Sequence, residues 1–156
     1  MDSRAKTARR VGTVGYQAAT ADSFLAALRE AGTELVVDVR AVASSRRPGF
    51  SKSRLAANLA EAGIGYVHLR GLGTPAEGRA AARAGRHAEL RRIYHAHLAT
   101  LEAKAELAEL SELVRSGQRV CLLCFEHDPA HCHRSLVAAA LGELLPIRVD
   151  HLSPTI

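Results

Sequence analysis

Two kinds of hydrophobic pattern alternate along the chain. Short, nearly continuous apolar runs predict strands at residues 11–16, 35–40, 64–69, 119–125 and 147–149. Longer stretches, in which apolar residues recur every three or four positions, predict helices at about residues 21–31, 55–62, 87–115 and 129–144. This alternation is typical of α/β proteins. We therefore expect a single-domain three-layer sandwich, with a mostly parallel sheet of about five strands and helices on both faces.

The remaining segments complete this organisation. Residues 1–10 are polar and basic, and we expect a flexible basic N-terminus ahead of one domain over residues 11–156. Residues 70–85 are rich in glycine and are predicted to form a mobile loop. We find no internal repeat and no linker. A chain of 156 residues is long enough to bury a core without disulfide bonds.

Composition narrows the cellular setting. The chain has only three cysteines, two of them in one short motif, which does not resemble a disulfide framework and indicates a reducing, cytoplasmic location. It has no apolar run as long as a membrane span and no apolar leader, so we expect no membrane partner. A formal net charge of +5 permits an anionic partner without establishing one.

The segment from Cys124 to Arg134 is dense in reactive side chains: two thiols, three imidazoles, two carboxylates and one guanidinium. It follows a predicted strand, and Asp128 and Pro129 predict the N-cap and first residue of the next helix. Cys132 and the following histidine would then lie at the helix N-terminus, where backbone N–H groups attract anions and can lower the pKa of a thiol. We expect a site for a negatively charged ligand here.

Polar side chains also follow the other predicted strands. In doubly wound sheets the ligand crevice lies outside the carboxyl ends of the strands. Separate segments of this chain therefore predict one common site. The chemically reactive residues at or after strand ends are Tyr16, Asp38, Arg40, Ser45, Arg46, His68, Cys124 and Glu126.

The cysteines allow several kinds of chemistry. Cys121 and Cys124 point to opposite faces of a strand, so we expect Cys121 to belong to the core. Zinc could be held by Cys124, Cys132 and His133, with His127 or His131, although the spacing matches no standard zinc finger. Cys132 could instead be a nucleophile, or the two thiols could simply pack at a helix–sheet junction.

The residues around the second predicted strand are also open to two interpretations. Asp38 and Arg40 can form a buried ion pair that holds the basic loop 44–54. Alternatively, Arg40 and Arg134 grip a phosphate or carboxylate while Asp38 or Glu126 acts as acid or base. Basic loops are commonly solvated surface, but Phe50 among arginines and lysines could stack on a nucleic-acid base.

Taken together, these motifs resemble the DUF488 family of bacterial and archaeal proteins. The motifs that carry the resemblance are residues 13–16, 37–40, 45–50, 64–69, 72–73, 122–126 and the Pro129-x-x-Cys132-His133-Arg134 sequence. The resemblance implies a Rossmann-like α/β domain. The family name denotes unknown function, and related Cys-His-Arg motifs recur in proteins suspected of handling nucleotides or nucleic acid.

Our leading hypothesis is a protein that binds a phosphate-bearing ligand, a nucleotide or a nucleic-acid end, with hydrolase or transferase activity. A non-catalytic nucleic-acid-binding module with a structural Cys/His cluster is one alternative, and a thiol redox or sulfur-transfer protein is another. The cofactor is unknown: Cys124, Cys132 and His133 are candidate ligands for zinc, but at this stage we do not favour a zinc site. The expected catalytic residues are Asp38, Cys124, Glu126, Cys132 and His133, and the expected ligand-binding residues are Tyr16, Arg40, Ser45, Arg46, His68 and Arg134.

Overall fold

The sheet has five parallel strands. A computed structural model describes residues 8–129 and 132–154. The strands are β1 (Arg9–Gly15), β2 (Leu35–Asp38), β3 (Gly65–His68), β4 (Val120–Cys124) and β5 (Ile147–Leu152). Their order across the sheet is β3-β2-β4-β1-β5, and every neighbouring pair is parallel. The predicted α/β sandwich is thus confirmed, and β2 and β4 are neighbours at its centre.

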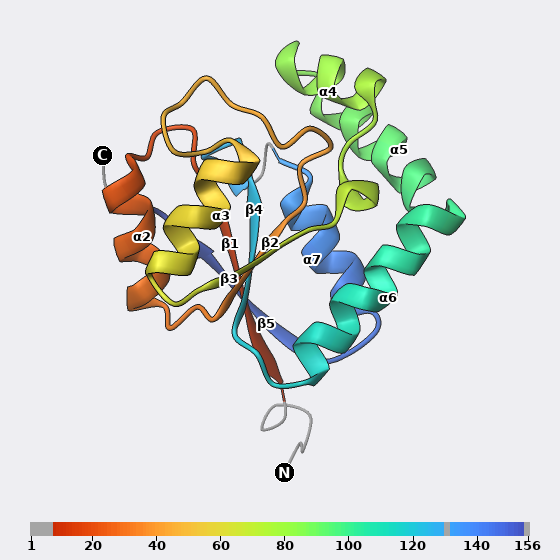
Figure 1. Ribbon diagram of the computed structural model, residues 1–156. Helices are drawn as coiled ribbons and strands as arrows, with labels where there is room; N and C mark the ends of the chain where they lie inside the picture. The colour runs from red at the N-terminus through yellow and green to blue at the C-terminus, as the bar shows by residue number, and fades with distance from the viewer. Residues whose placement is uncertain (1–7, 130–131, 155–156) are drawn as a thin grey trace.

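Helices cover both faces of this sheet, as Figure 1 shows, with α2 and α3 on one side and α6 and α7 on the other. The helices are α2 (Ala21–Glu30), α3 (Lys52–Glu61), α4 (Ala76–Arg83), α5 (His87–Leu98), α6 (Leu101–Arg115) and α7 (Arg134–Gly142), with a 3-10 turn, η1 (Arg70–Leu72). None of the described helices is long and apolar enough to cross a membrane.

Each face of the sheet has its own hydrophobic core. In β4, Cys121 and Leu123 pack with Phe24, Leu28 and other residues on the α2/α3 side. Leu122 and Cys124 face the opposite core, with residues of α5, α6 and α7. This alternation confirms that the two cysteines of β4 point to opposite faces and that Cys121 is a core residue.

Three predictions of local structure were wrong. Segment 70–85 is not a loop, since it contains η1 and α4. Helix 87–115 is divided into α5 and α6, because the Thr100 hydroxyl accepts the N–H of Ala103 and starts a new helix. Helix α7 begins at Arg134 with His133 as N-cap, rather than at Pro129 after Asp128. The Arg134 guanidinium donates to the carbonyls of Glu126 and His127, which holds these two residues against the start of α7.

Candidate functional site

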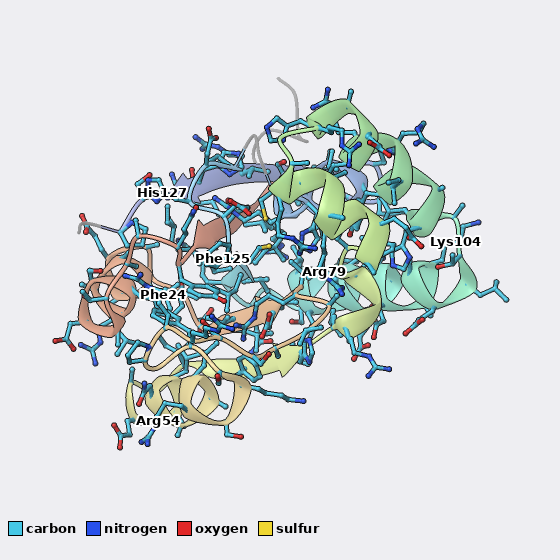
Figure 2. The ribbon with its side chains drawn as sticks, turned by 90° about the horizontal axis from the view of Figure 1, so that it is seen from above. Phe24, Arg54, Arg79, Lys104, Phe125 and His127 are labelled. Carbon is cyan, nitrogen blue, oxygen red and sulfur yellow. The ribbon has the colours of Figure 1, made fainter. Side chains whose placement is uncertain are left out.

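A cavity of about 330 Å³ opens at the carboxyl ends of β2 and β4. Its walls come from the loop after β2, from α4 and from the segment after β4. In the view from above (Figure 2), Arg79 and Phe125, both of which line it, lie toward the middle of the molecule, and Arg54 lies at the edge. The predicted site residues that line the cavity are Tyr16, Arg40, Ser45, Cys124, Glu126, Cys132 and His133.

Two glycines allow the walls to approach one another. A side chain at Gly15, the last residue of β1, would collide with the carbonyl group of Glu126. A side chain at Gly73, just before α4, would collide with the backbone of Ala41. Only a residue without a Cβ fits at such a close approach of two backbone segments. These glycines let the segment after β4 lie against β1, and let the start of α4 lie against the loop after β2.

The carboxyl end of β2 carries a buried ion pair, which we call the Asp38–Arg40 centre (Asp38, Arg40, Tyr16 and Tyr66). The guanidinium of Arg40 donates to both carboxylate oxygens of Asp38, at 2.9 and 2.7 Å. Tyr66 donates its hydroxyl to the same carboxylate at 2.5 Å. Arg40 also donates to the carbonyl of Phe50 at 2.7 Å and to the hydroxyl of Tyr16. Arg40 therefore anchors loop 44–54, as the ion-pair interpretation predicts.

Two groups of this centre, Arg40 and Tyr66, have raised pKa values. Burial lowers the pKa of the Arg40 guanidinium, but the hydrogen bonds and charge of Asp38 outweigh burial and raise the pKa above its ordinary value. Burial raises the pKa of the Tyr66 hydroxyl, and its hydrogen bond to Asp38 raises the pKa further. Both groups therefore keep their protons at neutral pH.

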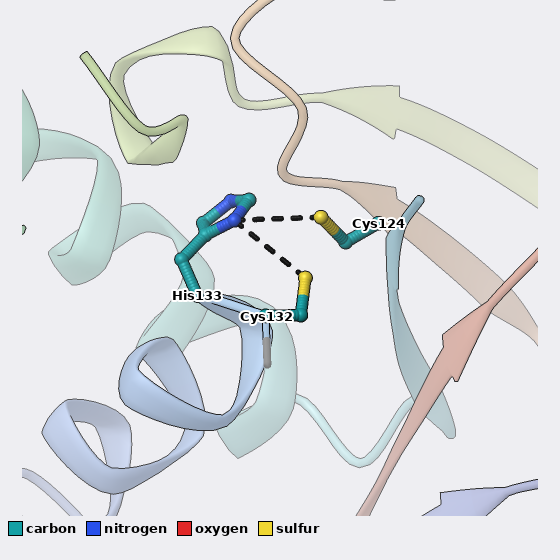
Figure 3. A group of neighbouring side chains, drawn as sticks. All are labelled: Cys124, Cys132 and His133. Carbon is teal, nitrogen blue, oxygen red and sulfur yellow. Dashed lines mark hydrogen bonds between the residues drawn. The ribbon is translucent and has the colours of Figure 1, made fainter. Parts of the chain in front are cut away.

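The carboxyl end of β4 carries a second buried group, the Cys–His cluster (Cys124, Cys132 and His133; Figure 3). The Nδ1 atom of His133 lies 3.4 Å from the sulfur of Cys124 and 3.8 Å from the sulfur of Cys132. The three atoms all lie within 4.8 Å of one another. The residues are only 4 to 6% exposed, yet all three line the cavity.

The other ring nitrogen of His133 fixes the orientation of the imidazole. Nε2 lies 2.6 Å from the carbonyl oxygen of Val39, which can only accept a hydrogen bond, so Nε2 carries the proton. The ring of Tyr94 packs against the imidazole, with 5.3 Å between ring centroids. The ring of His133 is therefore held in the one orientation that directs Nδ1 at the two sulfurs.

The two thiols of the cluster differ in acidity. Burial raises the pKa of the Cys124 thiol, and its hydrogen bond with Cys132 raises the pKa further. Burial also raises the pKa of Cys132, but hydrogen bonds from Cys124 and His133 and the positive charge of His133 outweigh burial and lower it well below the usual value. Burial lowers the pKa of His133, but the charge of Cys132 outweighs burial and raises it. Of the two thiols, Cys132 is therefore the one that loses its proton more readily.

Four predicted site residues lie outside the cavity lining. Asp38 is fully buried beneath it, and Arg46 is an exposed residue of loop 44–54. His68 lies beside a neighbouring hollow, where its Nε2 is 2.7 Å from the carbonyl of Arg40. Arg134 is fully buried and donates to the carbonyls of Glu126 and His127. In this structure the Arg134 guanidinium organises the loop below the cavity.

Burial and hydrogen bonding also show how other residues near the site are used. Phe50 is 1% exposed and stacks on the ring of Tyr16, with 4.5 Å between centroids, which contradicts a role in stacking on a nucleic-acid base. The guanidinium of Arg47 donates to the carbonyl of Ala19. His127 is exposed and outside the Cys–His cluster, and residue 131 lies outside the described part of the chain.

The sequence analysis missed two cationic residues of the site. Arg79 and Arg83, on α4, line the cavity together with Thr74. Arg79 donates to the Thr74 carbonyl, which fixes part of its side chain over the cavity. A signal was available: the two arginines are four residues apart, which places them on one face of a helix, and Gly85 follows at a positive φ of 76°.

Comparison with known proteins identifies a family. The family model described as domain of unknown function DUF488 matches residues 20–141, which is most of the chain. This match agrees with the resemblance seen in the sequence motifs. No curated protein and no solved structure matches the chain.

Proposed function

Because the chain belongs to the DUF488 family, whose function is unknown, we propose its function from the geometry of the site. The proposed function is to bind a small phosphate-bearing ligand in the cavity and to hydrolyse or transfer a group of that ligand at the Cys–His cluster. The supporting observation is the cavity itself, where arginines and a buried reactive cluster face one space.

The charge of the lining favours an anionic ligand. Among the described residues, the lining contains Arg40, Arg79 and Arg83 and a single carboxylate, Glu126. The guanidinium of Arg40 already donates to Asp38 and to the carbonyl of Phe50, so Arg40 contributes positive potential rather than a direct contact. Arg83 is exposed and Arg79 is partly exposed, which leaves both able to donate to a phosphate.

The reacting groups lie at the base of the cavity. Cys124, Cys132 and His133 supply the nucleophile, and Glu126 is the carboxylate of the lining that can move a proton. The hydroxyl of Ser45 accepts the N–H of Arg47 and retains its own proton for the ligand. A ligand held by α4 at one wall would thus present its reacting bond to the cluster.

The proposal is tested by titrating the protein with inorganic phosphate and with a nucleoside monophosphate in a calorimeter. We expect the double variant Arg79→Gln/Arg83→Gln to bind at least about tenfold more weakly, because hydrogen bonds to charged groups contribute about 1.5–3 kcal/mol. The matched control is Arg54→Gln, an exposed arginine of α3 outside the lining. Equal affinity of the double variant and the control would contradict the proposal.

A second candidate, a nucleic-acid-binding module, is favoured by one observation. Arg46, Lys52 and Arg54 are exposed, in loop 44–54 and at the start of α3. Binding by these residues would weaken steeply with salt and would be reduced in the variant Arg46→Gln/Arg54→Gln, because their contacts would be to phosphates. The burial of Phe50 removes the expected stacking partner, so we rank this function below the first.

A further inference from the structure

We infer that the Cys–His cluster is a zinc site of the Cys2His type, with a fourth coordination position that opens into the cavity. The inference deepens the proposed function, since it identifies what the cluster offers to a ligand. It stands on the cluster's own geometry, so it can hold even if the ligand of the cavity is not a phosphate.

The ligand atoms are spaced like one face of a tetrahedron around a metal ion. With zinc–sulfur bonds of about 2.3 Å and zinc–nitrogen bonds of about 2.0–2.1 Å, tetrahedral angles place sulfur and nitrogen about 3.6 Å apart and the two sulfurs about 3.8 Å apart. The observed distances from His133 Nδ1 to the two sulfurs are 3.4 and 3.8 Å. All three atoms lie within 4.8 Å of one another, so one ion can reach all of them.

The hydrogen bonds of His133 favour a metal over a purely structural thiol pair. Since Nε2 donates to the Val39 carbonyl, Nδ1 of the neutral imidazole carries the lone pair, and this atom faces both sulfurs. That lone pair can accept a hydrogen bond from one of the two thiols, and the other thiol can then donate only to a sulfur, which is a weak acceptor. A metal ion would instead use all three atoms. A backbone acceptor on the outer nitrogen is also the usual support of a metal-bound histidine.

The kind of metal and its open position follow from the ligands. Two thiolates and an imidazole in tetrahedral arrangement suit zinc, whereas magnesium and calcium prefer oxygen ligands. Among the residues that the structure describes, the cluster has no fourth ligand: no further histidine, cysteine or carboxylate belongs to it. Three protein ligands with an open position are typical of catalytic zinc, which lowers the pKa of a bound water to about 7.

The test uses cobalt(II), a spectroscopic substitute for zinc, added to reduced, metal-free protein. We expect one equivalent to produce thiolate-to-cobalt charge-transfer absorption and the intense visible bands of tetrahedral cobalt, and zinc to abolish both. Cys124→Ser and Cys132→Ser should lose the charge-transfer absorption or reduce it by about half. The matched control is Cys121→Ala, in the same strand but buried on the opposite face, which should bind cobalt like the wild type.

Three outcomes would overturn the inference. One is the absence of cobalt–thiolate absorption in the reduced wild type, a result that does not depend on whether any variant folds. Another is full absorption in both serine variants. The third is wild-type protein that contains a Cys124–Cys132 disulfide and no zinc when it is purified without a chelator, which would support the thiol redox alternative instead.

The same samples separate this inference from the proposed function. If both hold, inorganic phosphate should shift the visible cobalt bands of the wild type, and Arg79→Gln/Arg83→Gln should bind cobalt normally but show a weaker phosphate effect. Cobalt binding without any phosphate binding would contradict the proposed function alone. Phosphate binding without a cobalt–thiolate site would contradict the zinc site alone.

Discussion

The carboxyl ends of β2 and β4 carry two buried polar centres that differ in how completely their groups are used. In the Asp38–Arg40 centre, both carboxylate oxygens accept hydrogen bonds from a guanidinium, and a tyrosine hydroxyl adds another. In the Cys–His cluster, two thiols converge on one nitrogen. The protein itself supplies hydrogen-bond partners to the carboxylate of the first centre. In the second centre, a single nitrogen atom faces two thiols.

We therefore assign different roles to the two centres, although both lie at the same edge of the sheet. A buried ion pair is costly to break, because a single charge would remain in a medium that solvates it poorly. It holds loop 44–54 in place through the carbonyl of Phe50. The Cys–His cluster lines the cavity beside that loop, so a metal or a substrate in the cavity could reach its two sulfurs and its Nδ1 atom. The Asp38–Arg40 centre therefore holds a wall of the cavity in place, and the Cys–His cluster is the part of the lining to which we assign the proposed chemistry.

The largest effect should follow from removing one charge of the Asp38–Arg40 centre. We expect Asp38→Asn to lower the free energy of unfolding by about 3–5 kcal/mol, because the buried guanidinium of Arg40 loses its counter-ion. Urea denaturation measures the change. The control is Glu112→Gln, which breaks the exposed pair with Arg115 and should cost less than about 1 kcal/mol. Similar losses in the two variants would show that the Asp38–Arg40 centre is not a structural unit.

A smaller difference in unfolding free energy is expected between variants of two tyrosines, Tyr66 of the Asp38–Arg40 centre and Tyr94 beside the Cys–His cluster. Tyr66 donates to the charged carboxylate of Asp38, so Tyr66→Phe should cost about 1.5–3 kcal/mol. Tyr94 packs on His133 but donates to the neutral carbonyl of Leu72, so Tyr94→Phe should cost about 0.5–1.5 kcal/mol. Thermal and urea unfolding of the two variants compare them directly. The reverse order would mean that hydrogen bonds near the Cys–His cluster carry more of the stability.

The smallest effect concerns an acidic residue on the cluster's side of the sheet. Burial and the neighbouring Glu102 raise the pKa of Glu106, so the folded protein holds this proton more tightly than the unfolded chain. The contribution of Glu106 to stability is therefore greatest below the ordinary pKa of 4.5, and it is lost as the pH rises through the folded value. Glu106→Gln should add less than about 1 kcal/mol at pH 7 and nothing near pH 4. Unfolding at both pH values tests this, and a loss of stability at pH 7 would contradict it.

Much of the fold follows from periodicity alone. The alternation of apolar runs and helical patterns predicted the parallel sheet, and strand alternation separated Cys121 from Cys124 correctly. The strand-end rule brought together Tyr16, Arg40 and Glu126 from three separate segments. These predictions succeed because they depend on burial, which is written into the sequence as a pattern of apolar positions.

Predictions that depended on local sequence signals, such as helix-capping residues, were less accurate. Asp128 and Pro129 are good helix starters, but the buried guanidinium of Arg134 binds the carbonyls before them and delays α7 to residue 134. The segment of α4 consists largely of alanine, arginine and glycine, so its weak apolar pattern concealed both the helix and the two arginines of the cavity. The late start of α7 depends on tertiary contacts that the sequence does not show, whereas the i, i+4 spacing of Arg79 and Arg83 was a signal that the weak apolar pattern hid.

The hydrogen bond from His133 to the Val39 carbonyl has a further consequence, for the entropy of binding. Val39 lies between Asp38 and Arg40, so its carbonyl belongs to a strand end that the ion pair already holds rigid. Ordering a side chain on binding commonly costs about 0.5–1.5 kcal/mol. For His133 that cost is incurred when the chain folds, and a metal ion or substrate would meet a preorganised ring.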